Sequence, residues 1–305
     1  MQKALNARIA KLFLLATAVI WGAAFVVMKN ALVSVPPFQL LAMRFGTGAV
    51  LLALVCVRRW KQLNRGYLWR GAVLGAFIFL AYAIQSIGLL GTTAAKSSFL
   101  TTSYCIIVPF LYWFIAHTRP DLFHCIAAVL CIIGIGLISL NEHFSITWGD
   151  GLTLVCAVFF AAHIVTVSKF AGSHDILLLT VLEFFFAALF SAAIGLIGLV
   201  TETWSAAVFT RHNAFSLIYL CVFATAVALL FQNIGQKNSS PMSASLILAS
   251  EALFGALFSA LYFEERFTPQ VLAGFVIIAA AILISETKLS FLRLNGQKSR
   301  TSQPE

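Results

Sequence analysis

The sequence predicts an all-α integral membrane protein, with about ten transmembrane helices arranged as two five-helix inverted repeats. Three observations predict this fold. Hydrophobic residues make up 61% of the 305-residue chain and charged residues only 10%, whereas soluble domains carry about 25% charged residues. The apolar residues gather into blocks that can cross a bilayer, for which about 20 residues suffice. The second half of the chain also repeats the first.

Charged residues, prolines and glycines separate the hydrophobic blocks. They delimit expected helices at residues 9–28, 38–57, 68–90, 94–116, 121–140, 150–169, 175–199, 214–236, 241–262 and 268–287. Residues 200–213 are expected to form a loop or a short interfacial helix. Arg8 and Lys11 precede the first block, as in a signal peptide. The block is longer than a typical signal sequence and has no clear cleavage site before Lys29, so we interpret it as a transmembrane helix.

The distribution of charge predicts the orientation, because cytoplasmic loops are rich in Lys and Arg. An even number of spans places both termini on one side, and that side receives Lys3, Arg8, Lys11, Arg58, Arg59, Lys61, Arg65, Arg70, Arg119, Lys169, Lys237, Lys288, Arg293, Lys298 and Arg300. The opposite side receives Glu142, Asp150, Glu202, Glu264 and Glu265. We therefore expect a multi-pass protein of the cytoplasmic (inner) membrane with both termini in the cytoplasm. This topology accounts for the net charge of +9, so the expected partner is the lipid bilayer and not nucleic acid.

An internal repeat appears when the chain is shifted by 147 residues, which places residues 85–139 on 232–286 without a gap. The polar matches are the informative ones, and they include Gln85 with Gln232, Ser98 with Ser245 and Arg119 with Arg266. Five helices per repeat is an odd number, so the second copy enters the membrane from the opposite side. Inverted repeats of this kind are a recurring architecture of secondary transporters. The expected units are a first repeat at 1–140, a second at 141–287 and a basic cytoplasmic tail at 288–305.

Four sequence segments resemble EamA-type members of the drug/metabolite transporter superfamily. They are WGAAFVVMK at 21–29, MRF at 43–45, TTAAKSSFLTTSYCIIVP at 92–109 and EALFGALFSALYFEER at 251–266. The resemblance implies ten helices in inverted repeats around a central cavity, lined mainly by helices 1, 3, 4, 6, 8 and 9. It also implies export or exchange of small metabolites such as amino acids. Many members have Pro after the glutamate of helix 9, but Ala252 follows Glu251 here, which puts a helix distortion at Glu251 in doubt.

Ionisable side chains deep inside a transmembrane helix are costly and tend to face a cavity or a partner. Four such residues are present: Arg44, His163, Glu183 and Glu251. Glu251, near the middle of the ninth expected helix, is the leading candidate for proton coupling and for binding a substrate ammonium group. The alternative is a structural hydrogen bond to a neighbouring helix.

Arg44 and Glu183 occupy roughly equivalent places in the two repeats. We expect a structural ion pair between them or separate contacts with helix-end carbonyls. The functional alternative is that Arg44 binds a substrate carboxylate in bidentate fashion. His163 is either a packed, hydrogen-bonded side chain or a titrating group in the cavity, and it is retained as a candidate substrate-binding residue.

Neutral polar and aromatic residues complete the candidate site. The substrate-binding candidates besides His163 and Glu251 are Trp21, Phe25, Tyr82, Gln85, Ser98, Thr101, Thr102, Gln232 and Asn233. The amides and hydroxyls can recognise a polar ligand, although interhelical hydrogen bonds account for them equally well. Trp21 and Phe25 lie one turn apart and would suit an apolar or aromatic moiety, although lipid-facing rings are also common in such a chain.

The missing motifs narrow the function. The sequence has no GxxxxGK[ST] phosphate loop, no HExxH and no GxSxG, so we expect neither ATP-driven pumping by this chain nor an enzyme. The six cysteines lack CxxC spacing and are interpreted as packing residues, and we expect no metal or cofactor. The prediction is a secondary transporter of a small metabolite, most simply an exporter of an amino acid or related amphipathic compound. The alternatives are a polytopic membrane enzyme or a non-transporting membrane subunit.

Other properties are weakly specified by the sequence. The side chains fit a drug-like cation or a nucleobase almost as well as a zwitterionic amino acid. Protons are a candidate coupling ion through Glu251. The uniformly apolar fifth and tenth helices, at 121–140 and 268–287, are candidates for the surface of a homodimer.

Overall fold

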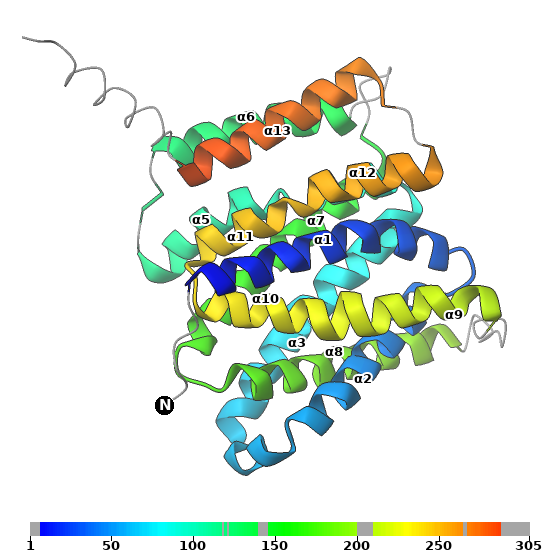
Figure 1. Ribbon diagram of the computed structural model, residues 1–305, viewed down its shortest axis with the longest axis vertical. Helices are drawn as coiled ribbons and strands as arrows, with labels where there is room; N and C mark the ends of the chain where they lie inside the picture. The colour runs from blue at the N-terminus through cyan, green and yellow to red at the C-terminus, as the bar shows by residue number, and fades with distance from the viewer. Residues whose placement is uncertain are drawn as a thin grey trace, which may run out of the picture.

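A computed structural model describes residues 7–117, 119–120, 122–139, 146–199, 210–264 and 267–287. These residues form long helices that are stacked in layers (Figure 1). The α-helices are α1 (Ala7–Ala31), α2 (Pro37–Val55), α3 (Arg65–Leu90), α4 (Ala94–Thr101), α5 (Tyr104–Ala116), α6 (Leu122–Ser139), α7 (Trp148–Ala171), α8 (Ile176–Leu199), α9 (Arg211–Ile218), α10 (Ala228–Lys237), α11 (Pro241–Ala249), α12 (Glu251–Phe263) and α13 (Pro269–Thr287). A 3₁₀ helix, η1 (Val57–Gln62), follows α2, and a π-helix, η3 (Tyr219–Val227), joins α9 to α10. The basic tail expected at 288–305 lies outside the described residues.

Residues with known positional preferences begin many of these helices. Side-chain oxygens of Asn64, Thr93, Thr147, Thr210 and Ser240 accept a hydrogen bond from the backbone N–H three residues later, at the starts of α3, α4, α7, α9 and α11. Pro37, Pro241 and Pro269 are the first residues of α2, α11 and α13, where the missing N–H has no helical acceptor to lose.

Among the described residues, eight helical stretches are long and apolar enough to cross a membrane. They are Arg8–Ala31, Pro37–Val55, Arg65–Leu90, Ala94–Ile115, Trp148–Ala171, Ile176–Ile197, Asn213–Lys237 and Pro241–Phe263. The remaining two expected spans correspond to α6 and α13, whose apolar stretches are shorter, at Cys125–Gly134 and Pro269–Ala281. The chain is therefore an all-helical, multi-pass membrane protein, and the count of ten spans stays a prediction.

Two of the expected helices are broken in their middles. Residues 94–116 divide into α4 and α5, and residues 241–262 divide into α11 and α12. At each break a hydroxyl bonds back to the preceding turn: Thr102 Oγ1 donates to the Phe99 carbonyl at 2.7 Å, and Ser250 Oγ to the Ile247 carbonyl at 2.7 Å. Such bonds compete with the helical hydrogen-bond ladder and bend helices. A break before Glu251 therefore occurs with alanine, and not proline, at position 252.

The two halves of the chain pack with approximate two-fold symmetry. Helices at equivalent places in the repeats pack against each other, α2 with α8 and α6 with α13. The contact of α3 with α7 also has its counterpart in the contact of α10 and η3 with α1. Figure 1 shows α1 between α12 and α10, with α6 and α13 at one edge and α2 at the other.

Glycines allow the central helices to approach closely. A Cβ on Gly22 of α1 would lie 2.4 Å from the Phe254 Cβ of α12. A Cβ on Gly255 would lie 2.4 Å from the Ser98 Oγ of α4. Helix α12 is therefore held tightly between α1 and α4, beside the cavity described next.

Candidate substrate cavity

Both halves of the chain contribute to a small cavity in the middle of the helices. Its lining residues are Trp21, Ala24, Phe25 and Met28 of α1, Arg44 of α2, Tyr82 and Gln85 of α3, Thr101 of α4, Tyr104 of α5, Phe160 of α7 and Glu251 of α12. All of these side chains are buried. The cavity measures about 20 Å³, which is room for about one water molecule. The side chains around this site therefore leave little free volume.

Glu251 and Tyr104 meet at the breaks of the two divided helices. The Tyr104 hydroxyl donates to Glu251 Oε1 at 3.1 Å, and the two residues are 147 positions apart. They are the first residues of α12 and α5, so they occupy equivalent positions in the two repeats. A contact between equivalent positions lies on or near the axis that relates the halves. The N-terminal end of α12 also favours a carboxylate electrostatically.

Arg44 reaches the cavity from α2 with its side chain buried. Its Nε donates to Thr225 Oγ1 at 2.9 Å and its Nη1 to Met28 Sδ at 3.3 Å. The guanidinium carbon lies 4.6 Å from the centre of the Tyr82 ring. These three contacts are with neutral groups, and within the described residues no carboxylate forms an ion pair with Arg44.

Among the described residues, Glu183 has partners other than Arg44. Glu183 Oε1 lies 2.8 Å from His163 Nε2, and Glu183 Oε2 accepts a hydrogen bond from Asn233 Nδ2 at 2.9 Å. The same Asn233 nitrogen donates to Thr180 Oγ1 at 2.9 Å. Arg44 contacts α1, α3 and η3, whereas Glu183 contacts α7 and α10, so the two charges have different neighbours although their sequence positions correspond.

The cavity contains about half of the residues predicted from the sequence. Trp21, Phe25, Tyr82, Gln85, Thr101 and Glu251 line it. Ser98, Thr102, His163, Gln232 and Asn233 are buried but are not among its lining residues. Ser98 Oγ donates to the Ala95 carbonyl of its own helix at 2.8 Å and, between helices, to the Ala252 carbonyl at 3.5 Å. Thr102 Oγ1 donates to the Phe99 carbonyl of its own helix.

Sequence reasoning missed Ala24, Met28 and Phe160. The first two had a readable signal, because Trp21, Ala24, Phe25 and Met28 follow the i, i+3, i+4, i+7 spacing of one helical face. Arg44, for which a structural pairing was expected and substrate binding was the alternative, also lines the cavity.

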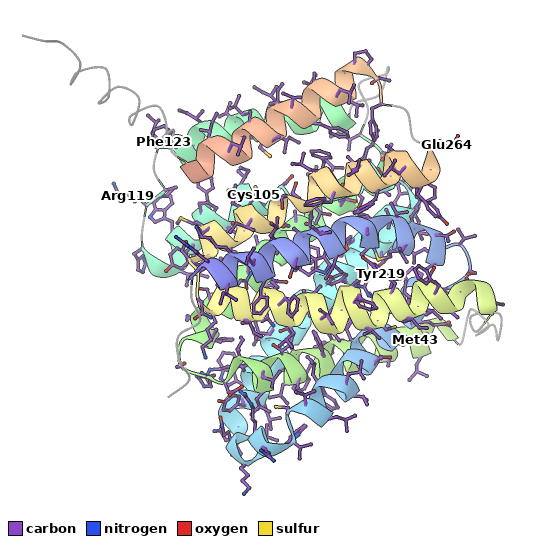
Figure 2. The ribbon with its side chains drawn as sticks, in the orientation of Figure 1. Met43, Cys105, Arg119, Phe123, Tyr219 and Glu264 are labelled. Atoms are coloured by element: carbon purple, nitrogen blue, oxygen red, sulfur yellow. The ribbon has the colours of Figure 1, made fainter. Side chains whose placement is uncertain are left out.

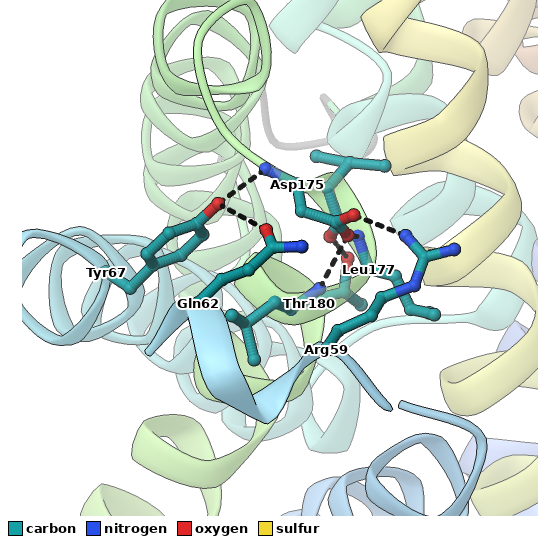
Figure 3. Close-up of polar contacts among 8 residues, drawn as sticks. Arg59, Gln62, Tyr67, Asp175, Leu177 and Thr180 are labelled. Carbon is teal, nitrogen blue, oxygen red and sulfur yellow. Dashed lines mark hydrogen bonds and ion pairs between the residues drawn. The ribbon is translucent and has the colours of Figure 1, made fainter. Parts of the chain in front are cut away.

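A polar cluster joins the two halves at one end of the molecule (Figure 3). Asp175, which precedes α8, forms an ion pair with Arg59 of η1. Its backbone N–H donates to the Tyr67 hydroxyl of α3 at 2.9 Å, and its Oδ1 accepts from the Leu177 N–H at 3.0 Å. We call Arg59, Tyr67 and Asp175 the latch.

Figure 2 shows Arg119 and Glu264 at opposite ends of the helices.

Comparisons with known proteins agree with this architecture. The EamA-like transporter family matches the chain twice, at residues 8–140 and 147–287. An uncharacterized transporter of Archaeoglobus fulgidus is 31% identical over 284 residues, covering 90% of this chain and 85% of the relative. The uncharacterized transporter YvbV of Bacillus subtilis is 26% identical, covering 88% of this chain and 89% of the relative.

The fold also matches a solved structure described only as "Crystal structure of protein", with a TM-score of 0.70 and 16% identity, covering 93% of this chain and 98% of the other. The helices, the doubled unit and the shared buried cavity define a multi-pass membrane transporter built from two similar halves. The chain belongs to the EamA-like transporter family, as the resemblance of its segments predicted.

Proposed function

We propose that the protein is a secondary transporter that exports an amino acid or a related amphipathic compound across the cytoplasmic membrane by alternating access. The observation that carries this proposal is the Tyr104–Glu251 hydrogen bond between equivalent positions of the two halves. It lies at two helix breaks and at a cavity that both halves line. Secondary transporters built from inverted repeats bind substrate at such broken helices between the repeats.

Alternating access requires two shapes with the same binding site. Two halves of similar structure but opposite membrane orientation supply them, because each half can adopt the conformation of the other. The contracted cavity corresponds to a state closed to a metabolite. The doubled match to one family and the packing of equivalent helices support this mechanism. The export direction rests on the family resemblance.

Both termini are proposed to be cytoplasmic, with the latch at the cytoplasmic end. Arg58, Arg59, Lys61 and Arg65 cluster around η1 at that end. Cytoplasmic loops carry such an excess of basic residues.

Glu251 is the proposed proton-coupling residue. Its carboxylate lines the cavity and accepts a hydrogen bond from Tyr104. Ionisable residues inside a membrane mark ion and substrate pathways in many transporters. A proton on Glu251 would remove the charge that holds a substrate ammonium group, so proton and substrate binding would exclude each other. This exclusion fits export driven by proton entry.

Flux measurements in liposomes test both the proposed secondary transport and the proposed proton coupling by Glu251. We expect the purified protein to exchange a radiolabelled L-amino acid for unlabelled amino acid across the membrane, and an imposed pH gradient to drive net movement. Glu251→Gln should abolish the dependence of transport on pH. The control is Glu264→Gln, which changes an exposed carboxylate at the other end of α12. Normal transport by Glu251→Gln with unchanged pH dependence would exclude the coupling role.

A further inference from the structure

Arg44 is a buried cation in the cavity wall with neutral neighbours. Its side chain is 1% exposed, and its described contacts are a hydroxyl, a thioether and an aromatic ring. A buried charge needs a countercharge, and an unpaired one inside a membrane is especially costly. The wall of the cavity thus contains a positive charge whose partner must come from elsewhere.

The carboxylates nearest to this region in the fold have other partners. Glu183 is held by His163 and Asn233, both outside the cavity lining. Glu251 lines the same cavity but accepts its hydrogen bond from Tyr104. Within the described chain, the cavity therefore has one cation and one carboxylate in its wall that form no ion pair with each other.

We propose that Arg44 binds the carboxylate of the transported compound, a proposal that rests on the transport function proposed above. The guanidinium has five N–H donors in a planar fork. Its Nε donates to Thr225 and its Nη1 to Met28, and the Tyr82 side chain also interacts with it. The remaining donors match the two oxygens of a carboxylate. Stacking on Tyr82 fixes the plane of the fork.

The rest of the lining defines the other parts of the compound. Glu251 provides a negative charge for an ammonium group. Trp21, Phe25 and Phe160 provide aromatic surface for an apolar portion. The cavity thus fits a zwitterion with an apolar side chain, anchored at opposite charges by Arg44 and Glu251.

Three matched compounds distinguish the contribution of the ligand's carboxylate from that of its ammonium group. L-Phenylalanine carries both, 3-phenylpropionate lacks the amine, and L-phenylalaninamide lacks the carboxylate. Dissociation constants would be measured on the detergent-purified full-length protein from the dose-dependent rise of its thermal unfolding midpoint. We expect Arg44→Gln to weaken binding of phenylalanine and 3-phenylpropionate about tenfold or more, which is the typical effect of losing a hydrogen bond to a charged group. Binding of phenylalaninamide should stay within about twofold.

Two further variants keep the test decisive. Arg70→Gln removes an arginine at the end of α3, outside the cavity lining, and should change none of the three affinities. If Arg44→Gln does not unfold cooperatively, Arg44→Lys replaces it, because lysine keeps the charge but lacks the bidentate fork. It should weaken the two carboxylates and spare the amide.

Several results would overturn the proposal. They are equal affinities of wild type and Arg44→Gln for the carboxylates, an equal loss for all three compounds, or no response of the wild type to either carboxylate at concentrations at which phenylalaninamide binds. Liposome flux measurements distinguish a failure of carboxylate binding by Arg44 from a failure of the proposed transport function. Flux of phenylalaninamide without flux of the carboxylates would reject the role of Arg44 and keep secondary transport.

Discussion

His163, Glu183 and Asn233 form a buried polar cluster outside the cavity, where α7, α8 and α10 meet. All three side chains have no exposed surface. Hydrogen-bond donors stabilise a carboxylate at this depth. Removing one of its partners would leave the buried group uncompensated. The cluster therefore links α7, α8 and α10 through buried hydrogen bonds.

Removal of the imidazole should be strongly destabilising. We expect His163→Leu to lower the free energy of unfolding by about 3 kcal/mol, because the Glu183 carboxyl group then stays buried without its His163 hydrogen-bond partner. A large drop in the thermal unfolding midpoint would be the readout. The double variant His163→Leu/Glu183→Leu should regain most of the loss, because both polar groups are then absent. A double variant as unstable as the sum of the singles would show that the pair is not coupled.

The breaks of α4–α5 and α11–α12 bring the first residues of α5 and α12 to the cavity. A continuous helix would have carried Glu251 in an unbroken hydrogen-bond ladder. At the break, the first backbone N–H groups of α12 lack helical acceptors and form the positive end of its dipole. The dipole of α12 thus favours the Glu251 carboxylate in addition to the hydrogen bond from Tyr104.

Proline should be accepted directly after the break. Ala252 is the second residue of α12, where the missing N–H of proline costs no helical hydrogen bond. We expect Ala252→Pro to change the free energy of unfolding by less than about 1 kcal/mol and to preserve flux. The control is Leu257→Pro in the middle of the same helix, for which about 3 kcal/mol or more should be lost. Similar losses for both variants would show that α12 does not begin at Glu251.

The latch ties the η1 segment between α2 and α3 to the start of α8 (Figure 3). Cys56, the residue before η1, is buried beside it. Burial raises the pKa of the Cys56 thiol, the nearby Asp175 carboxylate raises this pKa further, and Arg59 partly opposes the shift. Because thiolate is the reactive form, Cys56 should react slowly at neutral pH and faster as the pH rises.

Asp175→Asn should speed the labelling of Cys56 by a maleimide severalfold at pH 7. The substitution removes the ion pair that closes the latch and also a charge that raises the pKa of the thiol. The experiment uses a chain in which Cys56 is the single cysteine. Arg58→Gln, next to the latch, is the matched control and should leave the labelling rate unchanged. Unchanged labelling in Asp175→Asn would mean that the latch does not cover Cys56.

At the scale of the whole molecule, the hydrophobic blocks predicted a helical membrane protein, and the resemblance of four segments predicted the family. The apolar helices of the described residues and the double family match confirm these two predictions. The repeat also places Tyr104 opposite Glu251, but the sequence does not say which faces of two helices meet. Arg44 and Glu183 illustrate the limit. Their positions correspond, yet packing directs one toward η3 and the other toward α7. Periodicity on one helix is readable from sequence, whereas contacts between helices depend on rotation about each axis.

The meeting of Tyr104 and Glu251 has a consequence for why one chain carries both halves. In a symmetric homodimer of a single five-helix unit, the residue on the two-fold axis would face its own copy. Two buried carboxylates in contact cannot both ionise, and two tyrosines would supply no charge. Covalent linkage of the two units lets the axis hold a phenol against a carboxylate, which is a hydrogen-bonded pair with a single ionisable acid. The duplicated chain can therefore place one unshared acid at its centre of symmetry, which identical subunits cannot do.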